Sequence, residues 1–256
     1  MNIKNLINWK LFLILLVACV IATMFVLPYS LSLYPVEIDI TPLMLFLSVV
    51  QNSILFALTI FLGLFLSKRV GMGLPILQGI LDGKNQTREI KSILVPSIAL
   101  GISAGIFILL LSIPFNKMIP ELRDLDVAIP AWKGFLASFY GGIAEEVLLR
   151  LFFVSLLVWI IFKIKWFKNG RPSLIGIWIS IVLAAIFFGL GHLPATAQIM
   201  PLTGLVVIRA IVLNGAGGII FGWLYWKKGL ESAIIAHFSA DIILHVITPF
   251  AASFFT

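Results

Sequence analysis

Two adjacent carboxylates, Glu145 and Glu146, stand inside an apolar run from about residue 131 to residue 162. An ionised group at the centre of a bilayer costs about 2.5–3.5 kcal/mol even on the lower scales. Glu146 and Arg150 are four residues apart, so on a helix they share a face and can neutralise each other. Glu145 is turned about 100° away by the helical period. It is either a spare carboxylate packed against a neighbouring helix or a functional group, and ionisable groups inside membranes are functional by default.

The other ionisable residues inside apolar runs also lie in the second half of the chain. The full set is Glu145, Glu146, Arg150, His192, Arg209, His237, Asp241 and His245. It includes all three histidines of the protein, and the first three apolar runs contribute nothing to it. Each such group must find a partner or a water-filled cavity. We therefore expect these side chains to share one polar site.

The histidines differ in what their surroundings offer. His237 and Asp241 are four residues apart, and a carboxylate beside an imidazole can fix its tautomer and raise its basicity. His245 continues the same stripe by another four residues, nearer the end of its run. His192 follows small glycines, which let a backbone or a substrate approach. Each also has a structural alternative, as an interfacial residue or a packing pair, and Arg209 is expected to neutralise a buried carboxylate or to reach the interface.

Together these residues suit general acid–base hydrolysis of a carbonyl group. No serine or cysteine nucleophile is evident, and the favoured interpretation requires no cofactor. Zinc is the alternative, because His192, His237 and Glu145 form a legitimate catalytic set of two imidazoles and a carboxylate. However, no two histidines share a helical turn in the His-Glu-x-x-His manner. Removal of metal with a chelator separates the two interpretations.

The composition requires lipid as the solvent. The 256 residues are 61% hydrophobic and 11% charged, with a mean hydropathy of +1.13. A soluble domain of this size has too little interior to bury so much apolar surface. We predict an all-α, polytopic transmembrane bundle that forms a single domain over residues 1–256. Residues 1–130 supply N-terminal helices, and residues 131–250 form the core that carries the polar groups.

The apolar runs predict seven helices. Runs of spanning length lie near residues 11–27, 42–66, 92–115, 131–162, 173–193, 203–226 and 230–250. An eighth, short interfacial helix would fit within the fourth run, before Gly141 and Gly142. The first run resembles a signal peptide, but it is long enough to span and no convincing cleavage site follows, so we expect a retained helix. The segment 67–91 is expected to be a surface connector.

Two further patterns describe packing and redox state. Gly101 with Gly105, and Gly218 with Gly222, have the small-xxx-small spacing that lets helices approach closely in lipid. Cys19 is the single cysteine, so an intrachain disulfide is excluded.

The basic residues are distributed unequally between the two sets of loops. One set holds Lys4, Lys10, Lys68, Arg69, Lys84, Arg88, Lys91, Lys163, Lys165, Lys168, Arg171, Lys227 and Lys228, and the other holds Lys117, Arg123 and Lys133. Thirteen against three is a strong bias, and by the positive-inside rule it places the N-terminus in the cytoplasm. We predict a multi-pass protein of the cell membrane. The net charge of +7 does not indicate nucleic acid as a partner, because these residues lie in short loops between apolar runs.

If the helices are straight and parallel, His192 and His237 lie at different depths in the membrane. His237 lies nine residues after Lys228, or about 14 Å of helix. His192 lies 21 residues after Arg171, or about 32 Å. For the two imidazoles to meet, the helices must be tilted or one helix must begin elsewhere.

Three motifs in this order resemble those of a known family. Glu145-Glu146-x-x-x-Arg150, Phe188-x-x-x-His192 and His237-x-x-x-Asp241 are similar to the motifs of the CPBP family of intramembrane proteases. That family takes in type II CAAX prenyl endopeptidases, Abi proteins, and bacteriocin-processing and immunity proteins. The resemblance covers roughly residues 131–245. It implies an intramembrane endopeptidase whose partners are membrane lipid and a membrane-associated substrate, either a prenylated CAAX protein or a leader peptide.

The resemblance also implies roles for the first two motifs. Glu145 and His192 would activate the attacking water. Glu146 and Arg150 would form a supporting pair that orients the site. In this mechanism, base-assisted attack by water is followed by protonation of the leaving amine.

The third motif departs from the family pattern. By resemblance, His237 and the residue four later would stabilise the oxyanion of the tetrahedral intermediate. The family often has Asn at that position, whereas this chain has Asp241, and an ionised carboxylate would repel an oxyanion. Asp241 is therefore either protonated by burial or orients His237. Leu149 stands where Phe is common, and Leu151 where Gly is frequent, which changes packing more than chemistry.

Two other classes of protein remain open on the residues. A non-catalytic immunity protein or scaffold could keep the same residues for packing or for binding a partner. A proton-coupled transporter could use carboxylates and histidines as a relay. Against transport, the halves show no repeat and no pair of broken helices in corresponding positions.

Overall fold

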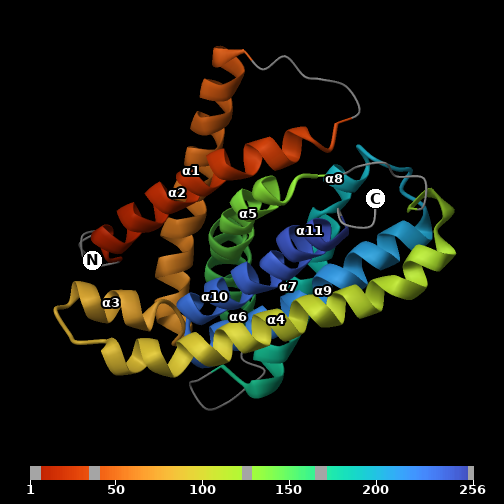
Figure 1. Ribbon diagram of the computed structural model, residues 1–256. Coiled ribbons are helices and arrows are strands. Elements are labelled where there is room, and N and C mark those ends of the chain that lie inside the picture. Colours follow the sequence, from red (N-terminus) through yellow and green to blue (C-terminus); the bar gives the residue numbers. More distant parts are fainter. Residues whose placement is uncertain (1–6, 35–40, 123–128, 165–171, 253–256) are drawn as a thin grey trace.

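The computed structural model describes residues 7–34, 41–122, 129–164 and 172–252, and every regular element in these ranges is a helix (Figure 1). The uninterrupted long helices are α1 (Trp9–Leu31), α2 (Pro42–Val70), α4 (Thr87–Met118), α7 (Leu174–Gly191) and α9 (Gly204–Lys228). Short elements are α3 (Pro75–Leu81), the 3-10 turn η2 (Pro120–Leu122) and α8 (Leu193–Thr196). The predicted all-α architecture is confirmed.

Two further long helices contain π-helical segments. The first runs from α5 (Ala131–Phe139) through η3 (Tyr140–Glu145) and η4 (Val147–Val154) into α6 (Ser155–Lys163). The second runs from α10 (Leu230–Asp241) through η5 (Ile242–Ile247) into α11 (Thr248–Ala252). Such π turns are rare and occur frequently at functional sites. Both of these helices carry predicted site residues.

Within the described ranges, six helices are long and apolar enough to cross a membrane. They are α1, α2, α4, α7 with α8, α9, and the helix from α10 to α11. The remaining predicted run is helical from Ala131 to Lys163 but is divided by η3 and η4. A polytopic membrane protein is thus confirmed. Whole helix faces expose large apolar side chains such as Leu43, Val95 and Ile175, which lipid rather than water would cover.

The short helix that would fit before Gly141 and Gly142 corresponds to α5, but it is not a separate helix. The backbone continues through both glycines as part of η3, because they lie against neighbouring helices instead of breaking their own. The additional short helix is α3, inside the segment predicted to be a surface connector. Pro75 occupies its first position, and the carboxylate of Glu231 accepts a hydrogen bond of 2.8 Å from the backbone N–H of Leu77.

The helix ends follow local sequence signals. Thr41, Ser173 and Thr203 are N-caps whose side chains accept backbone N–H groups of α2, α7 and α9. Gly71 ends α2 in the left-handed conformation, with a φ of 73°, where a residue without a Cβ pays no steric cost.

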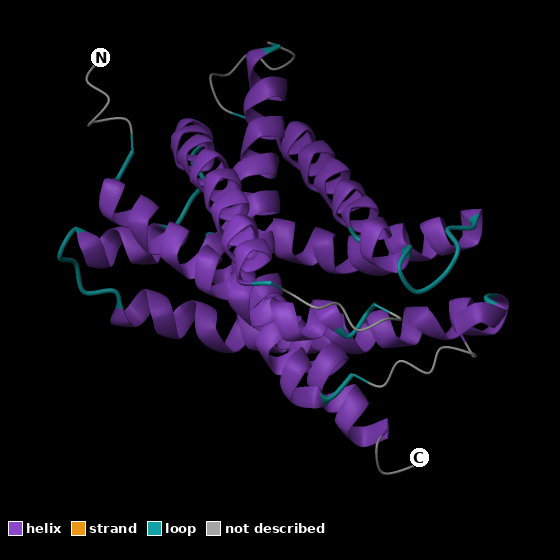
Figure 2. Cartoon of the chain, turned by 90° about the horizontal axis from the view of Figure 1, so that it is seen from above, coloured by secondary structure: helices purple, strands orange, loops and turns teal. Residues whose placement is uncertain are grey.

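Small residues allow the central helices to approach closely, as predicted. A Cβ at Gly218 would lie 2.9 Å from the Cβ of Ala185, and one at Gly222 would lie 2.8 Å from Ile181 Cγ2. These contacts seat α9 on α7. Gly101 similarly seats α4 on α10, where an added Cβ would overlap the carbonyl oxygen of Ala236. Seen from above, the helices cross at large angles instead of running parallel (Figure 2).

Candidate active site

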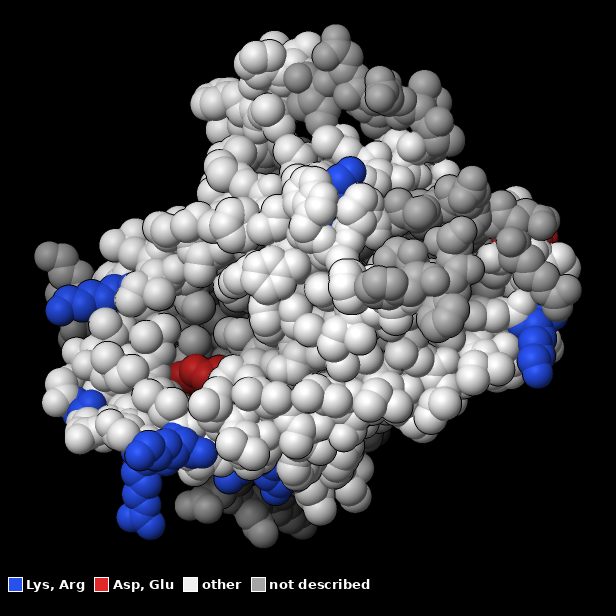
Figure 3. Space-filling view, viewed as in Figure 1, with Lys and Arg blue, Asp and Glu red and all other residues white. Residues whose placement is uncertain are grey.

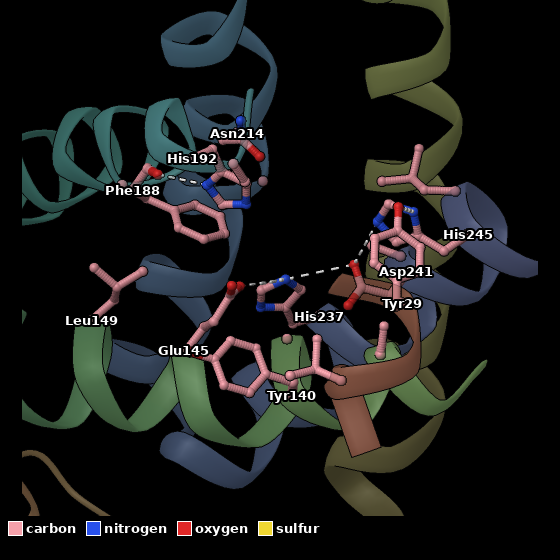
Figure 4. Close-up of a pocket in the computed structure, with 18 of the residues that line it drawn as sticks. Tyr29, Tyr140, Glu145, Leu149, Phe188, His192, Asn214, His237, Asp241 and His245 are labelled. Carbon is pink, nitrogen blue, oxygen red and sulfur yellow. Dashed lines mark hydrogen bonds and ion pairs between the residues drawn. The ribbon is translucent and has the colours of Figure 1, made fainter. Parts of the chain in front are cut away.

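Five of the eight ionisable residues singled out from the sequence line one cavity of about 540 Å³ (Figure 4). Its lining includes Glu145, His192, His237, Asp241 and His245, from three separate long helices. Most of the other lining side chains are apolar, and α1, α4, α7 and α9 each contribute to them. A polar centre in an apolar cavity suits a reaction that needs water in a largely dry site.

The first motif supplies a buried ion pair. Arg150 Nη1 lies 3.0 Å from Glu146 Oε1, and both side chains are almost completely buried. Arg150 Nη2 also donates to the carbonyl oxygen of Gly218, at 3.1 Å. The guanidinium carbon lies 5.2 Å from the centroid of the Phe188 ring and 5.6 Å from that of Phe221. The charge of Arg150 is therefore balanced by a carboxylate, a carbonyl and two aromatic faces.

Glu146 also determines how His237 is oriented. His237 Nδ1 lies 2.8 Å from Glu146 Oε1, and the imidazole stacks on Phe221 with 4.5 Å between ring centroids. A carboxylate paired with Arg150 has no proton to donate, so His237 donates its Nδ1–H. The other nitrogen, Nε2, faces Glu145 Oε2 at 3.8 Å and Asp241 Oδ1 at 3.7 Å. His237 thus presents only Nε2 to the cavity.

Glu145 differs from its neighbour in both exposure and contacts. Its side chain is 22% exposed, whereas that of Glu146 is fully buried. It is the last residue of the π-helical segment η3, and its carboxylate points into the cavity toward the histidines (Figure 4). The carboxylate that has no partner in its own helix is the one that reaches the cavity.

His192 lies on the same cavity, at the C-terminal end of α7. Its Nδ1 is 2.8 Å from the carbonyl oxygen of Phe188, so Nδ1 carries the proton and Nε2 is left as an acceptor. The Phe188 ring contacts both imidazoles, with centroid distances of 4.8 Å to His192 and 5.6 Å to His237. The crossing of the helices brings together two histidines that parallel helices would separate.

Asp241 lies between two imidazoles. Its Oδ1 is 3.7 Å from His237 Nε2 and 3.9 Å from His245 Nε2. His245 Nδ1 in turn lies 3.3 Å from the hydroxyl of Tyr29 on α1. The row of polar contacts from His237 through Asp241 to His245 therefore ends at Tyr29, in the N-terminal part of the chain.

Several lining residues escaped the sequence reasoning. Tyr29 and Asn214 are uncharged at neutral pH, so a search for ionisable groups passes over them, although an amide in an apolar run is a readable signal. Phe221 stacks on His237 but looks like an ordinary apolar residue in the sequence. A Cβ at Gly141 would overlap Asp241 Oδ2 and lie 3.2 Å from His237 Nε2. Its position four residues before Glu145 could have placed it on the same helix face.

Two other predictions concern Arg209 and a metal ion. Arg209 is outside the cavity lining, and no carboxylate in the described part of the chain forms an ion pair with it. Among the described residues, no three His, Cys, Asp or Glu side chains are arranged to hold a metal ion. The donors His192, His237 and Glu145 share a cavity without forming a coordination shell.

The sequence of the C-terminal half matches a known family model. Residues 127–243 match the model described as Type II CAAX prenyl endopeptidase Rce1-like. The matched segment contains all three motifs and confirms the family predicted from them. The match implies a CAAX-type intramembrane protease. No curated protein and no solved structure matches the chain.

Proposed function

From the family match at residues 127–243, we propose that this protein is an intramembrane endopeptidase that uses water activated by Glu145 and His192. The observation that carries the proposal is the contrast between two adjacent glutamates. Glu146 is held by Arg150 and His237, whereas Glu145 faces the cavity. A buried, neutralised carboxylate orients its neighbours, and a cavity-facing carboxylate can accept a proton.

The water would lie between two proton acceptors. The carboxylate of Glu145 and the bare Nε2 of His192 both face the cavity, so a water between them donates both of its hydrogens. Its lone pair is then directed at a carbonyl carbon in the remaining space. One acceptor takes the proton as the carbon–oxygen bond forms, which is general base catalysis. The same group returns that proton to the amine nitrogen as the peptide bond breaks.

The negative charge that develops on the carbonyl oxygen would be met by His237. Its Nδ1–H is bonded to Glu146, so a protonated ring carries its second N–H at Nε2, inside the cavity. The hydrogen bond and the stacking on Phe221 fix the ring before reaction. Preorganised donors of this kind usually supply the largest share of transition-state stabilisation. Asp241, flanked by two imidazoles, keeps both rings in place.

The first experiment is peptide cleavage by purified protein in liposomes. Wild type and Glu145→Gln are compared on a panel of prenylated CAAX peptides and leader peptides, each with and without a chelator. We expect Glu145→Gln to lose cleavage by about 10²–10⁴-fold, because it removes a general base. Glu121→Gln, at an exposed glutamate outside the cavity, is the matched control and should cleave normally.

The outcomes separate the competing interpretations. Loss in Glu145→Gln with an unchanged unfolding temperature supports the proposal. Loss of wild-type cleavage on adding a chelator would indicate that cleavage depends on a metal ion. A well-folded wild type that cleaves no peptide in the panel would favour a non-catalytic protein that binds a partner at this cavity.

A further inference from the structure

A second hollow, of about 640 Å³, lies where the ends of three long helices meet. α1 begins beside it, α2 and α9 end beside it, and the start of α3 completes its lining. It shares no lining residue with the active-site cavity. α1, α2 and α9 are all long and apolar enough to span a membrane, and the ends of spanning helices reach the headgroup region of a bilayer.

Three lysines from two of these helices line the hollow. Lys68 is in the last turn of α2, and Lys227 and Lys228 are the last two residues of α9. None of them forms an ion pair with a carboxylate of the described residues. The Lys227 ammonium lies 3.5 Å from the centroid of the Trp226 ring, which restrains its position without neutralising its charge. Like charges around one hollow repel each other, so an anion between them would stabilise the arrangement.

Acidic side chains do not supply that anion. Of the described residues that line the hollow, none is Asp or Glu. Two carboxylates on neighbouring segments bind α3 instead. Glu231 Oε1 accepts a hydrogen bond of 2.8 Å from the backbone N–H of Leu77, and Asp82 Oδ1 accepts one of 2.9 Å from Gln78 Nε2. These bonds hold α3 in place as one wall of the hollow. Figure 3 shows most Lys and Arg of the visible face at the end of the molecule where Figure 1 places α3.

The exposure of the lining residues indicates what kind of anion fits. The three lysines are exposed, whereas four apolar residues of the lining are buried, namely Ile7, Leu11, Leu64 and Leu74. Charge therefore lies at the rim and apolar surface at the base. A free phosphate ion would gain nothing from the apolar base, whereas a phospholipid carries its phosphate a few atoms from its acyl chains. A zwitterionic headgroup would bring its own cation against the lysines, so a net negative charge is favoured.

We propose that this hollow binds the phosphate headgroup of an anionic phospholipid, with Lys68, Lys227 and Lys228 as its cationic ligands. Basic pockets between transmembrane helices bind anionic headgroups, and ammonium groups form charge-assisted hydrogen bonds with phosphate oxygens. The headgroup would join the ends of α2 and α9, so bound lipid stabilises the folded bundle. Binding here involves no active-site residue and can be measured without peptide cleavage.

Thermal unfolding of the purified full-length protein in detergent tests the lipid. Dioleoyl phosphatidylglycerol is compared with dioleoyl phosphatidylcholine, which has the same chains without net charge, and with glycerol phosphate, which has no chains. We expect phosphatidylglycerol alone to raise the unfolding temperature, in a saturable manner that weakens with added salt. An equal shift with phosphatidylcholine would overturn the role of charge. An equal shift with glycerol phosphate would overturn the assignment to a lipid.

Two double variants test the residues. Lys68→Gln/Lys228→Gln removes two cations of the hollow. Lys84→Gln/Lys91→Gln is the matched control, because it removes two exposed lysines that follow α3 in the chain and do not line the hollow. We expect the first variant to bind phosphatidylglycerol about tenfold more weakly or worse, and the control to stay within about threefold of wild type. Equal loss in both would show a general attraction between a basic protein and acidic lipid, and would overturn the site.

Lysine acetylation of wild type keeps the site testable if the first variant fails to fold. The protein is treated briefly with N-hydroxysuccinimidyl acetate in either lipid, and the modified lysines are quantified by mass spectrometry. We expect phosphatidylglycerol to slow the modification of Lys68, Lys227 and Lys228 roughly threefold or more relative to phosphatidylcholine, because bound phosphate shields their ammonium groups. Lys84 and Lys91 should react equally in both lipids. Equal protection of all five lysines, or of none, would contradict a site at this hollow.

Discussion

The site consists of two halves, and each half contains a glutamate and a histidine. In the buried half, Glu146 is bound by Arg150 at 3.0 Å and by His237 at 2.8 Å, and water does not reach it. In the open half, Glu145 and His192 face a cavity with acceptor atoms directed into it. The two glutamates are adjacent in the chain, but they point in different directions from the helix and therefore have different surroundings. The contacts of each glutamate, and not its residue type, decide whether it supports the site or can take part in the reaction.

The buried half should matter for folding before it matters for cleavage. Its charges are few and neutralise one another, which is the condition under which a bilayer tolerates them. The open half can be changed without leaving a buried charge unpaired. Substitutions in the two halves should therefore separate loss of stability from loss of activity.

The largest effect is expected from Arg150→Met, which removes the cation and leaves the Glu146 carboxylate buried. Breaking a buried pair from one side costs about 3–5 kcal/mol, and total stabilities are about 5–15 kcal/mol. We expect the variant to accumulate poorly in membranes and to unfold at a lower temperature in detergent. Quantitative immunoblotting and a thermal unfolding curve measure both.

The double variant Glu146→Leu/Arg150→Met is the control for that experiment. With both charges gone, stability should largely recover, because buried pairs can often be replaced by apolar residues. Cleavage should stay low, since His237 loses the acceptor of its Nδ1–H. A single Arg150→Met variant with normal stability would show that the pair does not hold the buried half together.

A smaller effect is expected from Gly141→Ala, at the boundary between the halves. The added Cβ would overlap Asp241 Oδ2 and crowd His237 Nε2, so those side chains must move. Overpacking typically costs about 1–3 kcal/mol, and we expect cleavage to fall about 10–100-fold as the oxyanion donor is displaced. Gly204→Ala is the matched control, because nothing lies within 4 Å of a Cβ there. Equal rates in the two variants would contradict a close fit at Gly141.

Helices and ion pairs could be predicted because each depends on neighbouring residues. Apolar runs longer than a bilayer is thick can only be helices, and the spacing of four between Glu146 and Arg150 places them on one face. The His237–Asp241 stripe followed from the same rule. These inferences need no knowledge of how the helices pack.

What depends on packing between distant segments could not be predicted. Tyr29 reaches His245 from a helix 216 residues earlier, and nothing in the sequence near either residue indicates the other. The short helix α3 is stabilised by Glu231, 154 residues away, so its segment alone resembles a connector. The depths of His192 and His237 conflicted only under the assumption of parallel helices. Crossing angles follow from side-chain packing over whole helices, which a count along one chain does not contain.

The smallest effect is expected from Asp241→Asn, which tests whether the residue at position 241 stabilises the oxyanion or orients His237. In wild type, Asp241 Oδ1 lies 3.7 Å from His237 Nε2 and 3.9 Å from His245 Nε2. Asn keeps a carbonyl oxygen near both imidazoles. Asn cannot carry a negative charge and adds an N–H donor, and both differences favour an oxyanion. We expect cleavage to stay within about tenfold of wild type, or about 1.4 kcal/mol, and to rise where oxyanion formation limits the rate.

The control for this variant is Asp241→Ala, which removes the contact with both imidazoles and should cleave more slowly than Asp241→Asn. Neither Asn nor Ala at position 241 can be ionised, so the two variants differ only in the hydrogen bonds that they can form. The cleavage rates of both variants and of wild type are compared at several pH values. If Asp241→Asn were as inactive as Asp241→Ala, the negative charge itself would be what orients His237. Asp241 would then act with Glu146 in positioning the imidazole, and the buried half of the site would extend into the cavity.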